Sequence, residues 1–476
     1  MSFVNLKKVK DMKKKSLLLC SVMIMMFFLF SCKSEEESVF ENRDPVISLS
    51  QEELVSILFD NPEELDESEA IGLVSNFLEA LNAENATRSS RNVSLKVSDK
   101  FYYAPGDADQ PNTRSSSTGE IKLPIYEVSI TDARFTGVAY VSADERYPEV
   151  IVYTPKASGD NEAFIESGAI FLTEWAKASA LDEVLKVEQI REDYRAATVA
   201  KISQELGIPE SEVIYENIKD HLSVNGEPVT RATPVPGPPT QLVTSKGPFV
   251  PVQWYQDSPY NRYLPPTLPT AWQSNVYTGC STTAIAQLLT ACRPTLTIEG
   301  TQIDWDILTD TPEATISDSS TKLDMLGKLF KWIYEELEAI PIYDSNGNHT
   351  GTSVYTYMSD KFMTTHLNGG DLIDYDPDVL LSSMNAHKPS WISGQNHAFI
   401  VDGYIICQKA SKVLVVETKA DIVAMYDMYW HINLGWGGDY DGYYKLKKDT
   451  HVDIEAGSRT YSTQYLKIKA NLSKKN

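Results

Sequence analysis

The chain has few cysteines and little positive charge for its length. Its 476 residues include five cysteines, and 43 lysines and arginines stand against 66 aspartates and glutamates, giving a net charge of −23. So few cysteines exclude a disulfide-stabilised scaffold. The acidic balance excludes a nucleic-acid binder, which needs a basic surface. Because the cysteine count is odd, we expect at least one cysteine to have a function of its own.

The N-terminal region lacks an apolar run long enough to cross a bilayer as a helix. The run 17–30 has about 14 residues, whereas a membrane-spanning helix needs about 20. Six lysines precede it, between Lys7 and Lys15, and Ser31 follows it. A basic segment, a short apolar run and a small residue are typical of a secretory signal peptide, which we place over residues 1–31.

Metal-binding spacings are also missing from the sequence. None of the seven histidines belongs to an HExxH motif, and Asp439 and Asp441 do not stand in the twelve-residue loop pattern of a calcium site. We therefore expect no metal and no cofactor.

Apolar residues are abundant enough for folded cores. Hydrophobic residues make up 42% of the sequence and aromatic residues 10%, which excludes wholesale disorder. The length predicts two folded units after an N-terminal tail. The stretch 231–251 contains six prolines, and proline fixes φ and removes a backbone donor. We expect this stretch to be an exposed, extended linker between the two units.

The first unit combines helical and strand patterns. Ser50 followed by Glu53 is a capping box ahead of an apolar helical pattern. Apolar residues at helical spacing predict a second helix that ends near Asn82. The remaining patterns predict strands over 123–130, 137–142 and 150–153, a hairpin turn over 144–148, and a long helix over 161–206.

Cys280 lies in the second unit, in the segment TGCSTTAIAQLL. Gly279 supplies a tight turn, and the apolar residues that follow have helical spacing, so a helix should begin at or next to the cysteine. A helix N-terminus carries partial positive charge and free N–H groups, which favour the nucleophilic thiolate form of a cysteine. Cys280 is therefore a candidate nucleophile, although a buried structural cysteine fits the same local pattern.

Two later segments carry residues that would complete a cysteine-based site. His397 precedes the apolar run AFIV, so it should stand at the start of a buried strand, where a general base has a rigid mount. In HINLGWGG, we expect Asn433 to accept a hydrogen bond from the His397 ring and Trp436 to cover that bond. Considered separately, each segment also has an ordinary structural explanation. The first would be a histidine that flanks a strand, and the second an aromatic hairpin.

Gln256 stands 24 residues before Cys280, in the segment WYQDSPYN. A glutamine side-chain amide beside the backbone N–H of a nucleophile forms an oxyanion hole, whereas a lone glutamine in a loop needs no function. The order of glutamine, cysteine, histidine and asparagine along the chain is what favours a joint catalytic role for the four residues.

The segments WYQDSPYN, TGCSTTAIAQ, NHAFIVDGY and HINLGWGG together resemble the streptopain family of papain-like cysteine proteases, including its Bacteroides members. This resemblance implies Cys280 as the nucleophile and His397 as general base and acid. It also implies Gln256 as the oxyanion-hole residue, Asn433 as the orienting residue and Trp436 as a supporting residue.

The chain departs from the family pattern at two positions, in two different motifs. Leu434 replaces the first tryptophan of the family's HVNWGWGG-type motif, and Ser281 replaces the usual valine after the nucleophile. Neither change removes a catalytic atom. We expect them to affect substrate preference more than activity.

The resemblance also implies the fold class and the domain organisation. The fold is expected to be α+β, with a papain-like protease domain, a helical part plus an antiparallel sheet part, over 247–476. The segment GVAYVSADERYPEVIVYT resembles the family's propeptide, so an α+β inhibitory propeptide is expected over 48–230. An acidic linker over 32–47 and the proline-rich linker over 231–246, which holds the expected processing site, complete the chain.

Residues 29–32 resemble the lipobox of bacterial lipoproteins, which implies lipidation of Cys32 after signal cleavage. The acidic residues directly after it resemble a surface-export signal. We therefore expect an exported protein with a membrane anchor through lipid at Cys32, located at the outer membrane or cell surface, from which the mature protease is released.

The resulting hypothesis is a cysteine endopeptidase made as a zymogen. Its partners would be protein or peptide substrates, with its own propeptide as an intramolecular inhibitor, and not nucleic acid. Two alternatives stay open: a catalytically silent surface lipoprotein that uses the fold for binding, and a papain-like peptidoglycan amidase.

Overall fold

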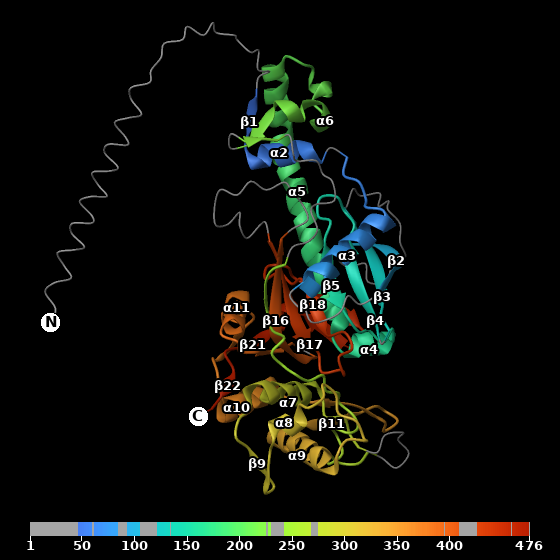
Figure 1. Ribbon diagram of the computed structural model, residues 1–476, viewed down its shortest axis with the longest axis vertical. Helices are drawn as coiled ribbons and strands as arrows, with labels where there is room; N and C mark the ends of the chain where they lie inside the picture. Colours follow the sequence, from blue (N-terminus) through green and yellow to red (C-terminus); the bar gives the residue numbers. More distant parts are fainter. Residues whose placement is uncertain are drawn as a thin grey trace, which may run out of the picture. The chain divides into compact units, whose positions relative to one another are not determined.

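Figure 1 shows a computed structural model of the chain. The structure describes residues 46–59, 61–83, 93–104, 121–133, 135–224, 227–229, 242–267, 275–394, 396–408, 426–457 and 459–475. Contacts between Cα atoms divide the chain into residues 1–45 and 46–476. The expected signal peptide, Cys32 and most of the acidic linker lie outside the described residues. Within the described ranges, no helix has both the length and the apolar character of a membrane span.

The N-terminal part, residues 46–229, contains both helices and strands. Their bounds are β1 (Ile47–Leu49), α2 (Gln51–Leu58), α3 (Glu67–Ala83), β2 (Ser94–Tyr103), β3 (Leu123–Thr131), β4 (Thr136–Ser142), β5 (Val150–Thr154), α4 (Asn161–Glu166), α5 (Ala169–Leu206), α6 (Tyr215–Ile218), β6 (Leu222–Val224) and β7 (Glu227–Pro228), with 3-10 turns at Glu210–Glu212 and Lys219–His221. The predicted capping box is confirmed at the start of α2, where Ser50 and Glu53 exchange hydrogen bonds. The three predicted strands are β3, β4 and β5.

The long predicted helix is divided into α4 and α5. Asp160 caps α4 by accepting a hydrogen bond from the Glu162 N–H. Gly168 then adopts φ +75°, a left-handed conformation that suits glycine, and α5 begins at the next residue. This interruption brings the backbone at Gly168 close to a residue of the C-terminal part, as described below.

The C-terminal part, residues 242–475, holds the remaining elements. They are β8 (Leu242–Lys246), α7 (Cys280–Cys292), β9 (Thr297–Ile298), β10 (Thr301–Gln302), α8 (Trp305–Leu308), α9 (Ser320–Glu336), β11 (Ile340–Tyr343), β12 (His349–Ser353), α10 (Thr356–His366), β13 (Leu367–Asn368), β14 (Leu372–Asp374), α11 (Pro377–Asn385), β15 (Ser390–Ser393), β16 (Ala398–Gln408), β17 (Tyr426–Asn433), β18 (Gly442–Tyr444), β19 (Asp453–Ala456), β20 (Arg459–Ser462), β21 (Lys467–Lys469) and β22 (Ser473–Lys474), with a 3-10 turn at Thr463–Tyr465.

One antiparallel sheet of eleven strands runs through both parts of the chain. Its order is β14-β21-β15-β16-β17-β18-β5-β4-β3-β2, and β8 pairs with β16 beside this path. The two parts join where β18 pairs with β5, with Tyr443 opposite Tyr153 and Tyr444 opposite Val152. The mixture of helices and antiparallel strands confirms the predicted α+β class.

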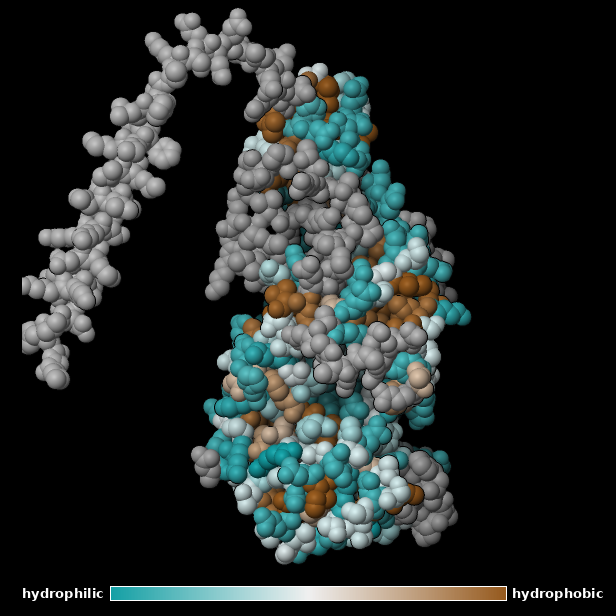
Figure 2. Space-filling view, viewed as in Figure 1, coloured by the Kyte–Doolittle hydropathy of each residue, from teal (hydrophilic) through white to brown (hydrophobic). Residues whose placement is uncertain are grey.

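The two faces of the central strands belong to different cores. Side chains alternate along a strand, so Phe399 and Val401 of β16 pack with α5 in one core, whereas Ile400 packs with α7 and α9 in another. Figure 1 shows α7, α8, α9 and α10 gathered on one side of the strands of the C-terminal part. The face seen in Figure 2 is polar over most of its described area, with separate apolar patches.

The linker prediction was wrong for residues 242–246. They form β8, which pairs with the outer half of β16, Tyr404 lying opposite Lys246. The last five residues of the predicted linker, LVTSK, contain no proline, so every backbone donor is available to a neighbouring strand. Residues 230–241, which hold the dense prolines, lie outside the described residues.

The cysteines of the C-terminal part are free thiols. Cys292, at the end of α7, and Cys407, in β16, are both buried, while Cys280 is partly exposed. No disulfide therefore joins Cys292 to Cys407.

Candidate active site

Cys280 is the first residue of α7, as the sequence predicts. Gly279 precedes the helix at φ +83°, and a Cβ added there would lie 3.0 Å from the Thr352 backbone oxygen, so only glycine fits. The helix is fixed by apolar residues such as Ile285 and Leu288, which are fully buried. The partly exposed Cys280 thiol therefore stands at the positive end of a rigid helix.

His397 stands immediately before β16, also as predicted. The Gly394 N–H donates to the His397 carbonyl oxygen at 2.9 Å and closes the turn between β15 and β16. Helix α7 packs against β15 and β16, the two strands on either side of this turn. The His397 Nε2 atom lies 3.2 Å from the Leu434 carbonyl oxygen. The structure thus gives the imidazole a backbone carbonyl as its partner instead of the expected Asn433 side chain.

Asn433 is held by a separate set of hydrogen bonds. Its Oδ1 accepts from Gln287 Nε2 at 2.9 Å and from the Gly435 N–H at 3.0 Å, and its Nδ2 donates to the Val252 carbonyl at 3.0 Å. These contacts use the oxygen that the sequence assigned to His397. Asn433 therefore ties β17 to α7, and the imidazole contacts the next residue along the chain.

Gln287 is a residue that the sequence analysis missed. Its Oε1 accepts from the Trp254 N–H at 2.8 Å while its Nε2 donates to Asn433, so it links the loop before α7 to β17. It follows Cys280 by seven residues, about two helical turns, and is fully buried. The sequence does contain one indication of this role, a single amide side chain in a run of apolar helix residues. A polar group that is buried with such residues needs hydrogen-bond partners.

Gln256 lies in the loop that leads to Cys280. Its carbonyl oxygen accepts from the Thr278 N–H at 2.9 Å, which fixes the loop two residues before Cys280. Beside it, Tyr255 packs edge-on against Trp436, with ring centroids 5.4 Å apart. Gln256 and Trp436 therefore belong to adjoining segments near the start of α7.

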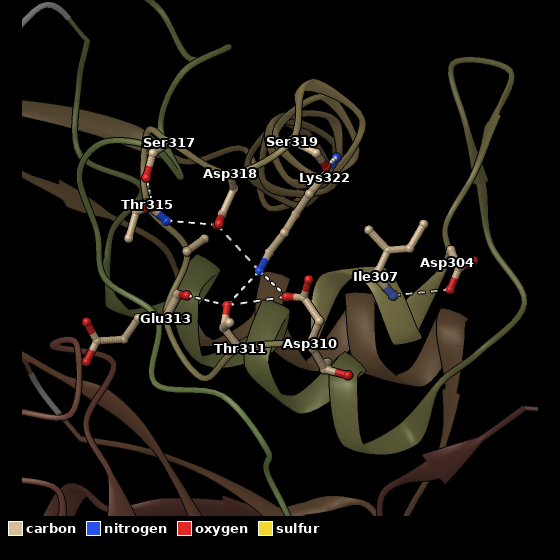
Figure 3. Close-up of polar contacts among 12 residues, drawn as sticks. Asp304, Ile307, Asp310, Thr311, Glu313, Thr315, Ser317, Asp318, Ser319 and Lys322 are labelled. Atoms are coloured by element: carbon tan, nitrogen blue, oxygen red, sulfur yellow. Dashed lines mark hydrogen bonds and ion pairs between the residues drawn. The ribbon is translucent and has the colours of Figure 1, made fainter.

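A buried lysine stabilises the segment that holds this loop. The Lys322 side chain is 2% exposed, and its ammonium reaches Asp310, the Thr311 hydroxyl at 2.7 Å and Asp318 at 3.4 Å. Figure 3 shows these groups converging on Lys322 from the segment before α9. That segment in turn binds the Gln256 loop, because the Gln253 N–H donates to the Pro312 carbonyl at 2.8 Å.

A second carboxylate acts on the Leu434 peptide group. Asp441 Oδ1 accepts from the Leu434 N–H at 2.7 Å, while the Leu434 carbonyl faces His397. Asp441 is 2% exposed, and burial raises the pKa of its carboxyl group to about 7. Asp441, Leu434 and His397 thus form a connected chain that fixes the imidazole. From the sequence, Asp441 was a candidate only for a calcium site.

Asp402 and His431 fix the neighbouring strands. Asp402 Oδ1 and His431 Nδ1 are 2.6 Å apart, and Asp402 Oδ2 accepts from the Val250 N–H at 3.0 Å. Burial acts to lower the pKa of His431, but the charge and hydrogen bond of Asp402 outweigh it and raise the pKa. This pair joins β16 and β17 next to the two strand ends that carry His397 and Asn433.

Comparison with known proteins identifies the C-terminal part. Residues 254–444 match the Peptidase C10 family, and this range contains Cys280, His397, Asn433 and Gln256. After this match, the C-terminal part, residues 242–475, is called the C10 domain. This match confirms the predicted resemblance to the streptopain family over residues 254–444. Curated proteins give no match to the chain.

Two solved structures of interpain A from Prevotella intermedia are similar to the chain. A fragment of prointerpain A with a cysteine-to-alanine mutation has a TM-score of 0.40 and 18% identity, over 74% of this chain and 96% of that one. Active wild-type interpain A has a TM-score of 0.32 and 18% identity, over 49% of this chain and 96% of that one.

The N-terminal part contacts the C10 domain at His397. A Cβ added to Gly168 would lie 3.1 Å from Cδ2 of the His397 ring, so the Gly168 backbone lies directly against the imidazole. Next to it, the Tyr461 hydroxyl of the C10 domain's C-terminal flank donates to the Ile165 carbonyl at 2.8 Å. Phe164 packs on Tyr440, with ring centroids 5.2 Å apart. The segment around α4 therefore covers one wall of the site.

This cover changes the chemistry of the imidazole. His397 is 6% exposed. Burial lowers the pKa of His397 to about 3, helped by the positive charge of Arg459 and opposed by the hydrogen bond to Leu434. The imidazole is therefore neutral at physiological pH while the N-terminal part is in place.

Proposed function

We propose that the chain is the precursor of an exported cysteine endopeptidase, and that its N-terminal part is an inhibitory prodomain. The observation that carries this proposal is the contact of Gly168 with the His397 ring, in a Peptidase C10 domain whose Cys280 begins α7. A segment packed on the general base of a thiol protease occupies space that a substrate must enter. From here on, residues 46–229 are called the prodomain.

The proposed reaction in the released enzyme is acyl transfer. The Cys280 thiolate attacks the carbonyl carbon of the scissile peptide bond, and the Gln256 side-chain amide and the Cys280 N–H stabilise the resulting oxyanion. The His397 imidazolium gives its proton to the leaving amine as the C–N bond breaks. The imidazole then takes a proton from water, and the hydroxide attacks the thioester, which releases the acid product and restores the Cys280 thiolate and the His397 imidazolium.

The protonation state of His397 explains why the precursor would be inactive. A thiolate–imidazolium pair requires a charged imidazole, whereas the covered ring has its pKa lowered to about 3. Removing the prodomain would return water to the ring and let the pKa rise toward the ordinary value of about 6.5. Release of the prodomain would therefore supply both access and the catalytic proton.

The deciding experiment compares cysteine variants of the full chain. Cys280→Ala is expected to stay full length and to show no activity on casein, whereas Cys292→Ala, at a buried cysteine outside the site, should mature and cleave. Normal processing and cleavage by Cys280→Ala would exclude the proposal. Activity on muropeptides instead of casein would favour the amidase, and a folded protein whose Cys280 does not react with an epoxide inhibitor would favour a binding protein.

We also propose export and lipid anchoring at Cys32, on the basis of the lipobox resemblance. Metabolic labelling with an alkyne fatty acid should label the wild-type chain and not Cys32→Ala. Cys20→Ala is the matched control, because it changes the other N-terminal cysteine and should leave labelling intact. Equal labelling of the wild type and Cys32→Ala would exclude this anchor.

A further inference from the structure

One charged contact joins the prodomain to the C10 domain beside the catalytic histidine. The Arg459 guanidinium donates to the Glu166 carboxylate through Nη2, and both side chains are about one quarter exposed. Glu166 ends α4, two residues before Gly168, which touches the His397 ring. The Glu166 carboxylate therefore belongs to the same segment that covers His397.

Arg459 is attached to the backbone that carries His397. Its Nη1 donates to the Asn396 carbonyl at 2.9 Å, and Asn396 directly precedes His397. The Asn396 side-chain amide donates back to the Thr460 carbonyl. These reciprocal bonds hold the start of β20 against the start of β16, so the guanidinium is a built part of the site and not a mobile surface group.

The charge of Arg459 reaches both proposed catalytic residues. It acts to lower the pKa of His397, second only to burial. Burial acts to lower the pKa of Arg459 itself, but Glu166, Tyr461 and Cys280 outweigh it and raise the pKa. A group that interacts with Cys280 and His397 together lies at the edge of the position that the scissile bond would occupy.

Release of the prodomain would remove the anion from this arginine. Glu166 is the acidic residue that pairs with Arg459 in the described part of the chain, and the Asn396 carbonyl would stay bound to Nη1 only. A half-buried guanidinium with an open Nη2 binds carboxylates well, since charge-assisted hydrogen bonds are about twice as strong as neutral ones. A substrate peptide that enters the site would supply a carboxylate in place of Glu166.

We propose that Arg459 forms a substrate subsite for an acidic side chain near the scissile bond, and that Glu166 fills this subsite in the precursor. The ligand class is a peptide with glutamate or aspartate within about three residues of the cleaved bond, because Glu166 lies this close to the backbone against His397. The inference rests on the proposed endopeptidase function and adds a specificity to it.

The test uses the matured enzyme and paired fluorogenic peptides. At each position from three residues before to three after the cleaved bond, glutamate is compared with glutamine, and the ratio of kcat/KM is measured within each enzyme. The wild type should prefer glutamate about tenfold or more at one position. In Arg459→Gln this ratio should fall to about one, and in Arg459→Lys it should be intermediate, because lysine keeps the charge and loses the planar fork.

The controls separate the subsite from a general loss of activity. Using the ratio within each enzyme cancels any change that affects all peptides equally. Arg293→Gln removes an arginine at the far end of α7, which pairs with Asp306, and should keep the wild-type ratio. Arg459→Glu should reverse the preference and favour lysine over glutamine at the same position.

The outcomes distinguish this inference from the proposed function. An enzyme that cleaves peptides with no glutamate preference, or with the same preference in wild type and Arg459→Gln, overturns the subsite and leaves the peptidase intact. Faster maturation of Arg459→Gln together with an unchanged ratio would mean that Arg459 only holds the prodomain. An enzyme that cleaves no peptide at all would instead contradict the endopeptidase function.

Discussion

At the scale of single residues, the site is defined by which group contacts the His397 imidazole. On one side the Leu434 carbonyl lies 3.2 Å from Nε2, and on the other the Gly168 backbone closes over Cδ2. The first contact orients the ring, whereas the second buries it, and burial lowers the pKa of His397. Both contacts are made by backbone, so neither is visible as a side-chain motif.

Gly168 should control access to the site, and a matched glycine makes this testable. Gly168→Ala places a Cβ 3.1 Å from the His397 ring at φ +75°, whereas Gly159→Ala places one in open space at φ +72°. Both substitutions carry a conformational cost of about 1 kcal/mol. We therefore expect several-fold faster iodoacetamide labelling of Cys280 in the Gly168→Ala precursor only, measured by mass spectrometry of the Cys280 peptide. Equal labelling of the two variants would show that this contact does not gate the thiol.

Asp441 should position the imidazole through the Leu434 peptide group. Asp441→Ala removes the acceptor of the Leu434 N–H, 2.7 Å away, and should lower kcat/KM of the mature enzyme by tenfold or more, because small displacements of catalytic groups cost that much. Asp441→Asn keeps an acceptor oxygen and should retain activity within a few-fold. Asp439→Asn, two residues away, serves as control, and similar losses in the Asn and Ala variants would argue against positioning.

The sequence predicted the places of Cys280 and His397 in the fold correctly, but it could not assign their partners. Local patterns place Cys280 at a helix start and His397 at a strand start, because both depend on adjacent residues. The partner of His397 depends on the path of the chain after β17. The Leu434 carbonyl contacts His397, and the Asn433 side chain binds Gln287. The pair of Glu166 and Arg459 joins residues that are 293 positions apart, which no local pattern reveals.

At the scale of elements, the prodomain binds by adding its strands to the sheet of the C10 domain. Strand β5 pairs with β18 through main-chain hydrogen bonds, and α5 packs on the same sheet through Leu172 and Trp175. Release of the prodomain would leave β18 as an unpaired edge, a feature that proteins keep short or cover. The three-residue length of β18 fits this requirement.

Gly442 should be required for this strand pairing. A Cβ at Gly442 would lie 2.2 Å from the Tyr153 carbonyl oxygen of β5, a distance that no backbone contact tolerates. Gly442→Ala should therefore separate β5 from β18 and lower the free energy of unfolding of the precursor by about 1–3 kcal/mol, measured by urea unfolding. Gly351→Ala, in β12 and with open space around its Cβ, is the control. An unchanged stability of Gly442→Ala would contradict the pairing.

Most elements of the prodomain followed from sequence periodicity, because its helices and strands each bury one face. The division of the long helix at Gly168 did not, since the interruption serves a contact with a distant residue. Strand β8 was missed for a related reason. Its partner on β16 is more than 150 residues away, and the prolines just before it favoured an extended linker.

At the scale of the whole molecule, the two parts share a core, so the stability of the chain depends on the contact that covers His397. Residues of α5 and of the C10 sheet pack in one hydrophobic cluster, and the imidazole is buried at its margin. Any condition that favours a charged His397 must therefore act against the closed precursor. Acid is the simplest such condition, and the direction follows from the pKa of His397.

The effect of pH on the inactive precursor should be visible in the stability of Cys280→Ala. In the unfolded chain His397 has a pKa of about 6.5, and in the folded precursor it is lowered to about 3. Above pH 6.5 the ring is neutral in both states and adds no pH dependence. Below pH 6.5 only the unfolded chain binds the proton, so the free energy of unfolding should fall by up to about 1.4 kcal/mol per pH unit.

A second variant isolates this histidine from the other titrating groups. Cys280→Ala with His397→Gln lacks the proton site, so its stability should decline less steeply between pH 6.5 and 4.5 in urea unfolding. Asp441, with its pKa raised to about 7, acts in the opposite direction, since it favours the folded state as pH falls, and it is present in both proteins. Parallel pH profiles of the two variants would mean that the prodomain does not hold His397 neutral. A steeper profile for the histidine protein would show that the cover over the active site is itself an acid-sensitive element of the fold.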